Sequence, residues 1–292
     1  MKHFMVIGAS GMIGEHIVTT LNSLEQKTIS TYNKTSIPFA SHLDVSNEKE
    51  VNKLIKDTNP QIIFMPAALT NVDYCETHPE EAYKINVSGV KNVVKASNST
   101  GARLIYFSTD YIFDGDNGPY SEEATANPIS IYGLQKLEAE HYVALFAKDY
   151  LIIRTTVVYG WERQGKNFIY RLVKSLSNGQ PIKAPIDQVG SPTYANNLSQ
   201  IAVHLSETTL SGVINITGPS QISRYEFARK AANIFRLDEN LVIPVQTESL
   251  NQSARRPKQA GLLTNKVTAI SAISVTNYEE GLALMVRDRA LI

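Results

Sequence analysis

The N-terminal segment joins a short apolar run, a glycine-rich turn and a helix-like stretch without a break. Residues 3–8 read HFMVIG, and glycines stand at positions 8, 11 and 14. Residues 12–24 then read as a helix. Glycine allows a tight turn off a strand and a close approach between strand and helix. The segment therefore predicts a strand, a tight turn and a helix, the opening unit of an α/β sheet.

The same order of strand and helix repeats along most of the chain. The apolar runs are continuous rather than alternating, which is typical of parallel strands covered by helices on both faces. We therefore expect an α/β fold, a doubly wound parallel (Rossmann) sheet with a second, smaller α/β domain. The expected strands cover 3–8, 27–32, 61–66, 103–108, 150–155 and 212–217, and the expected helices cover 12–24, 47–57, 79–98, 129–147 and 194–206.

Composition disfavours several classes of protein. The 28 basic and 28 acidic residues give a net charge of zero without a long block of like charge, so we expect no nucleic-acid partner. No stretch approaches the roughly 18 apolar residues of a membrane span, and the N-terminus does not read as a signal peptide. The single cysteine, Cys75, cannot form an internal disulfide, which fits a reducing compartment. These features predict a cytoplasmic protein in which Cys75 is incidental.

The spacing of the three glycines predicts a dinucleotide site. One glycine turns the chain off the strand, another lets the backbone approach a pyrophosphate, and the third lets helix and strand pack together. The N–H groups at the helix start would then face the phosphates. The pattern is G-x-x-G-x-x-G, and a plain strand-to-helix turn is the alternative interpretation. The residues expected around the pyrophosphate are Gly8, Ser10, Gly11, Met12, Ile13 and Gly14.

The end of the second expected strand bears on which dinucleotide binds. An NAD site usually carries Asp or Glu about 20 residues after the glycines. This strand instead ends in Tyr32, Asn33 and Lys34, with no acid. Lys34 would attract a 2′-phosphate, which favours NADPH, with NADH as the alternative and a solvated Lys34 as the other interpretation. Four more residues complete the expected cofactor site: Asp44 and Val45 near the adenine, and Ala67 and Ala68 after the third strand.

The strand and helix pattern loosens after residue 159, where prolines, polar loops and short helices predominate. Residues 193–217 still read as a helix and a strand of the first domain. We therefore predict an NAD(P)-binding Rossmann domain from 1–159 and 193–217. A substrate-binding domain would be formed by 160–192 and 218–292.

Two copies of Tyr-x-x-x-Lys occur, and each places both side chains on one helix face. Tyr132 and Lys136 follow a hydroxyl residue at an expected strand end, Thr109, whereas Tyr170 and Lys174 have no such partner. A tyrosine has an ordinary pKa near 10, and a nearby ammonium lowers it. We therefore predict that Tyr132 protonates a carbonyl oxygen held by Thr109 while hydride reaches the carbon. Lys136 would tune the tyrosine, and both would contact the nicotinamide ribose.

The glycine turn, Thr109 and the Tyr132–Lys136 pair together resemble the extended short-chain dehydrogenase/reductase family over nearly the whole chain. The resemblance implies catalytic roles for Thr109, Tyr132 and Lys136. It also implies a proton relay through Asn86, for which a plain polar helix residue is the alternative. The chain is similar to the dTDP-4-dehydrorhamnose reductase group in STDYIFDG, PYSEEATANPISIYGLQKLEAE, AALTNVDYCE, DQVGSPTYANNLSQIA and ARRP.

That group implies reduction of the 4-keto group of a nucleotide-linked 6-deoxy sugar, dTDP-4-dehydrorhamnose to dTDP-rhamnose, in a cleft between the two domains. It also implies a homodimer through helices 79–98 and 129–147, and we see no carboxylate cluster that predicts a metal. The group often has tryptophan where this chain has Val157, and the only tryptophan here is Trp161. The residues expected to contact the substrate are Thr109, Asp110, Tyr111, Phe113, Gln188, Arg255 and Arg256.

Gln188, Arg255 and Arg256 are assigned to the nucleotide diphosphate because a planar guanidinium matches phosphate oxygens. A solvated basic loop is the alternative for the two arginines. Two other functions stay open: a nucleotide-sugar epimerase or dehydratase, and a non-catalytic NADP-binding subunit resembling that of methionine adenosyltransferase. Dehydratases of this fold usually carry an acidic pair after the Ser/Thr, whereas only Asp110 follows here. The sequence leaves the identity of the sugar and the nucleotide open.

Overall fold

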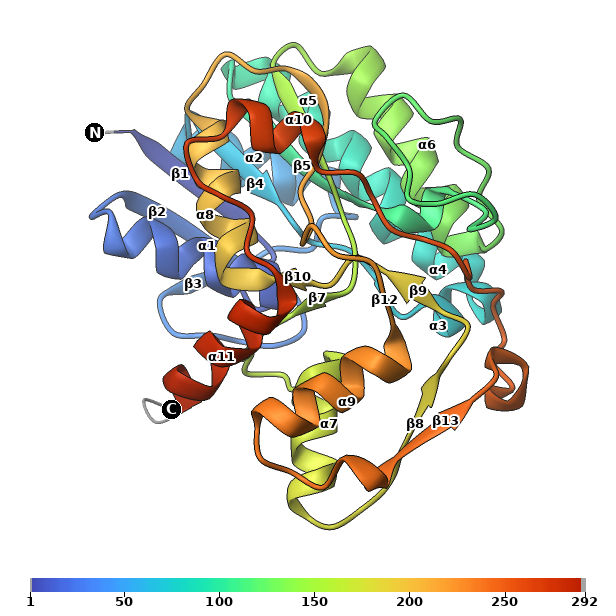
Figure 1. Ribbon diagram of the computed structural model, residues 1–292. Coiled ribbons are helices and arrows are strands. Elements are labelled where there is room, and N and C mark those ends of the chain that lie inside the picture. Colours follow the sequence, from blue (N-terminus) through green and yellow to red (C-terminus); the bar gives the residue numbers. More distant parts are fainter. Residues whose placement is uncertain (1, 290–292) are drawn as a thin grey trace.

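A seven-stranded sheet forms the centre of the computed structural model, which describes residues 2–289 (Figure 1). The strand order is β3-β2-β1-β4-β5-β6-β11, and every adjacent pair is parallel. The predicted doubly wound α/β sheet is therefore confirmed. Its strands are β1 (His3–Ile7), β2 (Lys27–Tyr32), β3 (Ala40–His42), β4 (Ile62–Met65), β5 (Arg103–Thr109), β6 (Tyr150–Thr155) and β11 (Gly212–Asn215).

Helices cover both faces of this sheet. One layer holds α1 (Met12–Ser23) and α8 (Ala195–Ser206); the other holds α2 (Glu48–Thr58), α5 (Gly89–Thr100) and α6 (Ile131–Phe146). Alternate residues of each strand face opposite layers, because successive side chains of a strand point to opposite faces. In β1, Phe4 and Val6 join the first layer, and Met5 and Ile7 join the second. Each such fully buried side chain contributes roughly 1.5–3 kcal/mol, and this explains why the strands are apolar throughout.

The predicted helix over 79–98 is divided into three pieces. It begins as α4 (Pro79–Tyr83), continues as a π-helical turn η1 (Lys84–Ser88), and ends as α5. The sequence did not predict two short elements nearby, α3 (Val72–Thr77) and β3. Proline at the first position of α4 fits a helix start, because its missing N–H has no partner there in any case.

A third group of buried side chains lies away from the main sheet, and we call it the outer cluster. It is built around α7 (Phe168–Ser177), α9 (Arg224–Ile234) and α11 (Tyr278–Arg289), beside the parallel pair β8 (Ile182–Pro185) and β13 (Val242–Val245) (Figure 1). Its buried members are Tyr159, Ile169, Leu172, Val173, Leu176, Ala184, Tyr194, Phe227, Ala228, Ala231, Ala232, Phe235, Val242, Leu282 and Met285.

Short elements join the outer cluster to the sheet. The pair β7 (Val158–Tyr159) and β10 (Thr193–Tyr194) is parallel, and the pair β9 (Val189–Gly190) and β12 (Ile222–Ser223) is antiparallel. Helix α10 (Asn265–Ile270) lies late in the chain but packs on the first layer through Val267. The remaining elements are the 3₁₀ turns η2 (Asp110–Ile112), η3 (Glu239–Leu241) and η4 (Thr247–Leu250). Between residues 2 and 289 no helix combines the length and the apolar character needed to cross a membrane.

Candidate active site

The glycine turn lies at the carboxyl end of β1, beside the end of β4. Gly8 has a φ of +94°, and a Cβ there would lie 2.9 Å from Cα of Ala67. A Cβ on Gly14 would lie 2.2 Å from the Gly8 carbonyl oxygen, so only glycine lets α1 pack this close to the turn. A Cβ on Gly11 would meet only that same oxygen, at 3.5 Å, so its other side is open.

The first turn of α1 is suited to bind phosphate. No side chain caps the N-terminus of α1, whereas Asn47 caps α2 and Ser130 caps α6. Uncapped N–H groups and the helix dipole together favour an anion at this position. With the open side of Gly11, these residues fit the pyrophosphate of a dinucleotide. Met12 and Ile13 open the helix, and the Ser10 carbonyl accepts a hydrogen bond from Gln164.

The residues predicted at the adenosine end follow β2 and β3. Lys34 is highly exposed, and its Nζ lies 3.8 Å from a carboxylate oxygen of Glu81. Tyr32 ends β2 and packs edge-on against His42, and Asn33 follows it. The end of β2 is therefore followed by the long, exposed cationic side chain of Lys34, and the strand end itself carries no acidic residue.

The other predicted cofactor residues follow β3 and β4 in the chain. The Asp44 carboxylate accepts the Ser46 N–H at 2.9 Å and so shapes the loop after β3. Val45 is buried, and a Cβ on Gly89 of α5 would lie 2.6 Å from its Cγ2 atom. Ala67 donates its N–H to Ile7 O at 3.1 Å, and Ala68 follows it half-buried. These residues thus surround the same sheet edge as the glycine turn.

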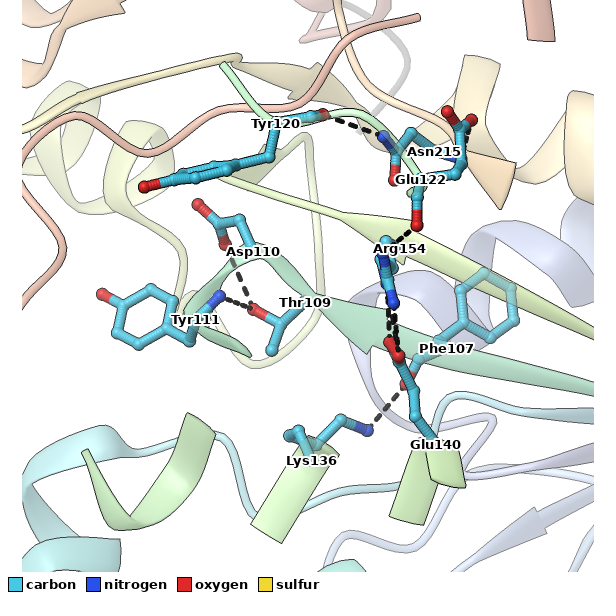
Figure 2. Close-up of polar contacts among 10 residues, drawn as sticks. All are labelled: Phe107, Thr109, Asp110, Tyr111, Tyr120, Glu122, Lys136, Glu140, Arg154 and Asn215. Atoms are coloured by element: carbon cyan, nitrogen blue, oxygen red, sulfur yellow. Dashed lines mark hydrogen bonds and ion pairs between the residues drawn. The ribbon is translucent and has the colours of Figure 1, made fainter. Parts of the chain in front are cut away.

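Thr109, Tyr132 and Lys136 meet at the carboxyl end of β5. Thr109 is the last residue of the strand, and its hydroxyl accepts the Tyr111 N–H at 3.2 Å and donates to Asp110 at 3.1 Å (Figure 2). Tyr132 lies in the first turn of α6, and its ring packs edge-on against Tyr111 with centroids 5.7 Å apart. Tyr132 hydrogen-bonds Thr109, and Lys136 on the same helix reaches Phe107, two residues before Thr109. The three predicted catalytic residues therefore lie along the carboxyl end of β5.

Gly133 makes this approach possible, and the sequence analysis did not identify it. A Cβ on Gly133 would lie 2.1 Å from the Tyr111 carbonyl oxygen and 3.1 Å from Cβ of Pro128. The Ser130 hydroxyl accepts the Gly133 N–H at 3.2 Å and fixes the start of α6. The glycine beside Tyr132 was the only available signal, and it acquires meaning only once Tyr111 is placed.

Burial sets the protonation of the catalytic tyrosine. It raises the pKa of Tyr132 well above the ordinary value of 10.0, and the Asp110 charge adds to the rise, while a hydrogen bond with Thr109 opposes it. Tyr132 is therefore protonated at neutral pH, which is the form that a proton donor needs. Lys136 is not among the groups that shift this pKa. The lysine's tuning of the tyrosine stays a prediction.

The Lys136 ammonium faces the sheet. Its Nζ donates to the Phe107 carbonyl at 2.7 Å (Figure 2). The same Nζ lies 4.2 Å from the ring centroid of Tyr106. Burial lowers the pKa of Lys136 to about 7, and the Glu140 carboxylate opposes this shift. An ammonium has three N–H donors, so the bond to Phe107 leaves two for other acceptors.

A cleft opens beside the catalytic residues. Asp110, Tyr111 and Gln188 are among the residues that line it, and Asp110 directly follows Thr109. Burial raises the pKa of Asp110 to about 6, although its carboxylate accepts the Thr156 hydroxyl at 2.6 Å. The full lining is Asp110, Tyr111, Thr156, Val157, Gln188, Val189, Gly190, Pro192, Ile222, Arg224, Phe227, Pro257 and Ala260.

The predicted Phe113, Arg255 and Arg256 are not among the residues that line this cleft. Phe113 is fully buried, and its ring stacks on that of Tyr120 with centroids 4.2 Å apart. It therefore anchors the segment after η2 in the interior. Arg256 donates to a carboxylate oxygen of Asp73 at 2.7 Å. Arg255 is exposed.

The sequence analysis missed Arg224, the first residue of α9. It lines the cleft, its guanidinium lies 4.9 Å from the Phe168 ring centroid, and it interacts electrostatically with Asp110, Arg171 and Arg256. Arg224 therefore brings positive charge to the cleft, and Arg171 and Arg256 are close enough to act on it electrostatically. Ser223 begins α9 with a capping box, a local signal that marks the helix start but not the direction of the next side chain.

Asn86 and Cys75 lie behind the catalytic helix. The Asn86 carboxamide accepts the Leu69 N–H at 2.8 Å and donates to Leu69 O and to Gln135 Oε1, each at 3.2 Å. It thereby ties the loop after β4 to α6. Burial raises the pKa of Cys75 to about 11, which makes the thiol unreactive at neutral pH.

Val157 and Trp161 occupy different places in the site region. Val157 lines the cleft with a φ of +42°, a conformation that β-branched residues rarely adopt. Trp161 lies against the outer cluster, where its indole N–H donates to Met285 O at 2.8 Å. Tyr170 belongs to the second Tyr-x-x-x-Lys copy and lies on α7, and its ring packs edge-on against Trp161. The described residues contain no group of three or more metal-binding side chains.

The parallel sheet, the uncapped glycine turn and the Thr109–Tyr132–Lys136 set define an NAD(P)H-dependent oxidoreductase of the short-chain dehydrogenase/reductase class. The chain belongs to the family described as RmlD substrate binding domain, whose model matches residues 1–290.

Known proteins resemble the chain over most of its length. A dTDP-4-dehydrorhamnose reductase of Sinorhizobium fredii is 31% identical over 252 residues, 82% of this chain and 84% of the relative. A crystal structure of dTDP-4-dehydrorhamnose reductase from Bacillus anthracis in complex with NADP has a TM-score of 0.90 and 32% identity, covering 98% of this chain and 99% of that chain. Methionine adenosyltransferase 2 subunit beta of Mus musculus is 27% identical over 96% of this chain and 86% of its own length.

Proposed function

We propose that the protein reduces the 4-keto group of a nucleotide-linked 6-deoxy sugar with NADPH, converting dTDP-4-dehydrorhamnose to dTDP-rhamnose. The meeting of Thr109, Tyr132 and Lys136 at the carboxyl end of β5, on the same edge of the parallel sheet as the glycine turn after β1, carries the proposal. Two of the relatives described above are named for this substrate, and one of them binds NADP.

Each catalytic residue has a separate task in this proposal. When bound, NADPH supplies the hydride that reaches C4 of the sugar. Tyr132 donates its proton to O4, so its O–H bond breaks as the new hydroxyl forms. The Thr109 hydroxyl orients O4, and the Lys136 cation favours the phenolate that remains. Two free N–H donors let Lys136 hold the ribose hydroxyls at the same time.

The cofactor would lie across the sheet edge between β1 and β4, where the strand order reverses. Gly8, Ser10, Gly11, Met12, Ile13 and Gly14 would surround the pyrophosphate. Tyr32, Asn33 and Lys34 would surround the 2′-phosphate, Asp44 and Val45 the adenine, and Ala67 and Ala68 the nicotinamide side. The open face of Gly11 and the uncapped α1 support this placement.

The sugar and its diphosphate would occupy the cleft. Asp110, Tyr111 and Gln188 line it, which supports their predicted contacts with substrate. We add Arg224 to the diphosphate site, because it lines the cleft and interacts electrostatically with Arg256. Arg256 itself pairs with Asp73.

We also propose the two-domain division given above, a homodimer and a cytoplasmic location. The outer cluster supports the substrate-binding domain, although α10 packs on the main sheet. The exposed apolar residues Leu134, Leu145 and Phe146 on α6 support a homodimer through this helix. The unpaired, buried Cys75 supports a reducing compartment.

The test is NADPH oxidation with a panel of 4-keto nucleotide sugars, run on the wild type and on two matched variants. Tyr132→Phe removes the proposed proton donor, so we expect turnover to fall by about 10²–10⁴-fold with little change in NADPH affinity. Tyr170→Phe, in the second copy of the motif, should retain wild-type turnover.

Unchanged turnover in Tyr132→Phe would contradict the catalytic assignment. Conversion of the sugar without net NADPH oxidation would indicate an epimerase or dehydratase. No reaction with any 4-keto nucleotide sugar, together with tight binding to a partner enzyme, would indicate a regulatory subunit.

A further inference from the structure

Helix α6 presents a third ionisable residue on its catalytic face. Tyr132, Lys136 and Glu140 follow one another at intervals of four, so they lie on the same side of the helix. All three are buried, and Glu140 is only 2% exposed. The Glu140 charge also raises the pKa of Lys136, against the effect of burial. A carboxylate this deeply buried requires a counter-charge.

Arg154 on β6 supplies that counter-charge. Its Nε lies 2.9 Å from Oε1 and 3.2 Å from Oε2 of Glu140, and its second terminal nitrogen lies 3.0 Å from Oε2 (Figure 2). Both side chains are more than nine-tenths buried. The forked geometry engages both carboxylate oxygens, which makes this a strong charge-assisted contact.

The remaining guanidinium nitrogen of Arg154 reaches the segment that precedes α6. It donates to the Glu122 carbonyl at 3.0 Å, and the Glu122 carboxylate accepts the Asn215 N–H at 2.9 Å (Figure 2). The Asn215 carboxamide in turn donates to Tyr120 O at 3.1 Å. One continuous network therefore joins the face of α6 to β6, β11 and residues 120–122.

We propose that Glu140 and Arg154 are positioning residues that set the charge and the direction of the Lys136 ammonium. This inference rests on the proposed reductase function. Because Arg154 occupies both oxygens of Glu140, the carboxylate stabilises Lys136 from a distance and does not bind it directly. The carboxylate thereby favours the charged form of Lys136, and the ammonium directs one donor to Phe107 O. Its other donors stay free for the ribose and the tyrosine.

The charged and titratable groups around Lys136 determine what each variant should do. Tyr106 lies on the β5 side and Tyr132 on its own helix, and both have a pKa raised chiefly by burial. Glu140 raises the pKa of Lys136. A cation acts with the opposite sign, so we expect the adjoining Arg154 to lower that pKa. The Asp110 charge raises the pKa of Tyr132, which lies one helical turn before Lys136. The two members of the pair therefore act on the lysine with opposite sign.

The experiment measures the pH dependence of kcat/KM and of the NADPH dissociation constant in four variants. Both kcat/KM and NADPH affinity should fall at alkaline pH, as Lys136 loses its proton. Glu140→Gln should move this fall to lower pH by about one unit, and Arg154→Met should move it to higher pH by about one unit. The double variant removes both charges and should return the limb close to the wild-type position, with a lower kcat because the lysine is no longer held. Glu138→Gln is the matched control, because Glu138 lies on α6 but pairs with half-buried Lys91 at 2.9 Å, away from Lys136 and Arg154.

A purely structural pair would lower kcat in both single variants without moving the pH limbs apart, and that result overturns the proposal. Thermal melts identify any single variant that does not fold. The double variant then decides alone, since replacing both members of a buried ion pair is often tolerated. Wild-type kcat in the double variant would overturn the proposal. NADPH binding reports on Lys136 even if the wild type reduces no sugar, so the two proposals fail separately.

Discussion

The close contact between α6 and the segment after β5 leads to a quantitative expectation for Gly133→Ala. The new Cβ would start 2.1 Å from the Tyr111 carbonyl oxygen, and real Cβ atoms essentially never come within 3.0 Å of such an atom. The helix and the Tyr111 backbone must therefore separate from 2.1 to at least 3.0 Å, a movement of about 0.9 Å. Tyr132 is the adjacent residue, so its phenol moves with the helix.

A misplacement of about 1 Å at a reacting group can cost about 10²-fold in rate. We therefore expect kcat of Gly133→Ala to fall by about 10²-fold, a loss of about 2.7 kcal/mol in transition-state stabilisation. The glycine turn is formed by another part of the chain, so only the ribose contacts of α6 should be disturbed, and the NADPH dissociation constant should change much less than kcat. Gly133→Ala should still catalyse the same reaction as the wild type.

Steady-state NADPH oxidation gives kcat, and a fluorescence titration gives the NADPH dissociation constant. Gly179→Ala is the control: it also replaces a glycine, at a φ of +67°, but nothing lies within 4 Å of the new Cβ. It should lose some stability and keep its kcat. A kcat for Gly133→Ala within twofold of the wild type would refute the reasoning from contact distance.

Two further expectations concern charged residues. Lys34→Glu should weaken NADPH binding by about tenfold and NADH binding much less, because only NADPH carries a 2′-phosphate; equal effects on the two titrations would remove Lys34 from the cofactor site. Burial raises the pKa of Asp110 from 3.8 to about 6, so this carboxyl's contribution to stability is full below pH 3.8 and is lost as pH rises through about 6. Asp110→Asn should therefore gain about 3 kcal/mol relative to the wild type between pH 3.5 and pH 7 in chemical denaturation, and a pH-independent difference would count against the shifted pKa.

The sequence predicted the sheet well, because parallel strands buried on both faces must be apolar throughout. Strands β2 and β6 match their predicted ranges, and β1 differs by one residue. The short strand β3 was missed, since Ala40–His42 carries no apolar run. The helix predicted over 79–98 was continuous, but the structure places a π-helical turn at Lys84–Ser88, where the Asn86 side chain binds Leu69. That contact spans the fold and leaves no local pattern.

The sequence could place the proposed catalytic residues together because Tyr132 and Lys136 are neighbours on one helix and Thr109 ends a strand. Residues defined by distant partners were not predictable. Arg154 pairs with Glu140 across a helix and a strand, and Arg224 reaches the cleft from α9. No local pattern links either arginine to its partner, so only the fold reveals what it faces.

The segment after β7 also has an experimental use. Trp161 is the single tryptophan of the chain. Its carbonyl is 3.0 Å from Nε2 of His16 on α1, its indole binds Met285 on α11, and nearby Gln164 donates to Ser10 O in the glycine turn. The protein thus carries a native fluorophore at the junction between the glycine turn and the outer cluster, and its emission reports on that junction without an added label.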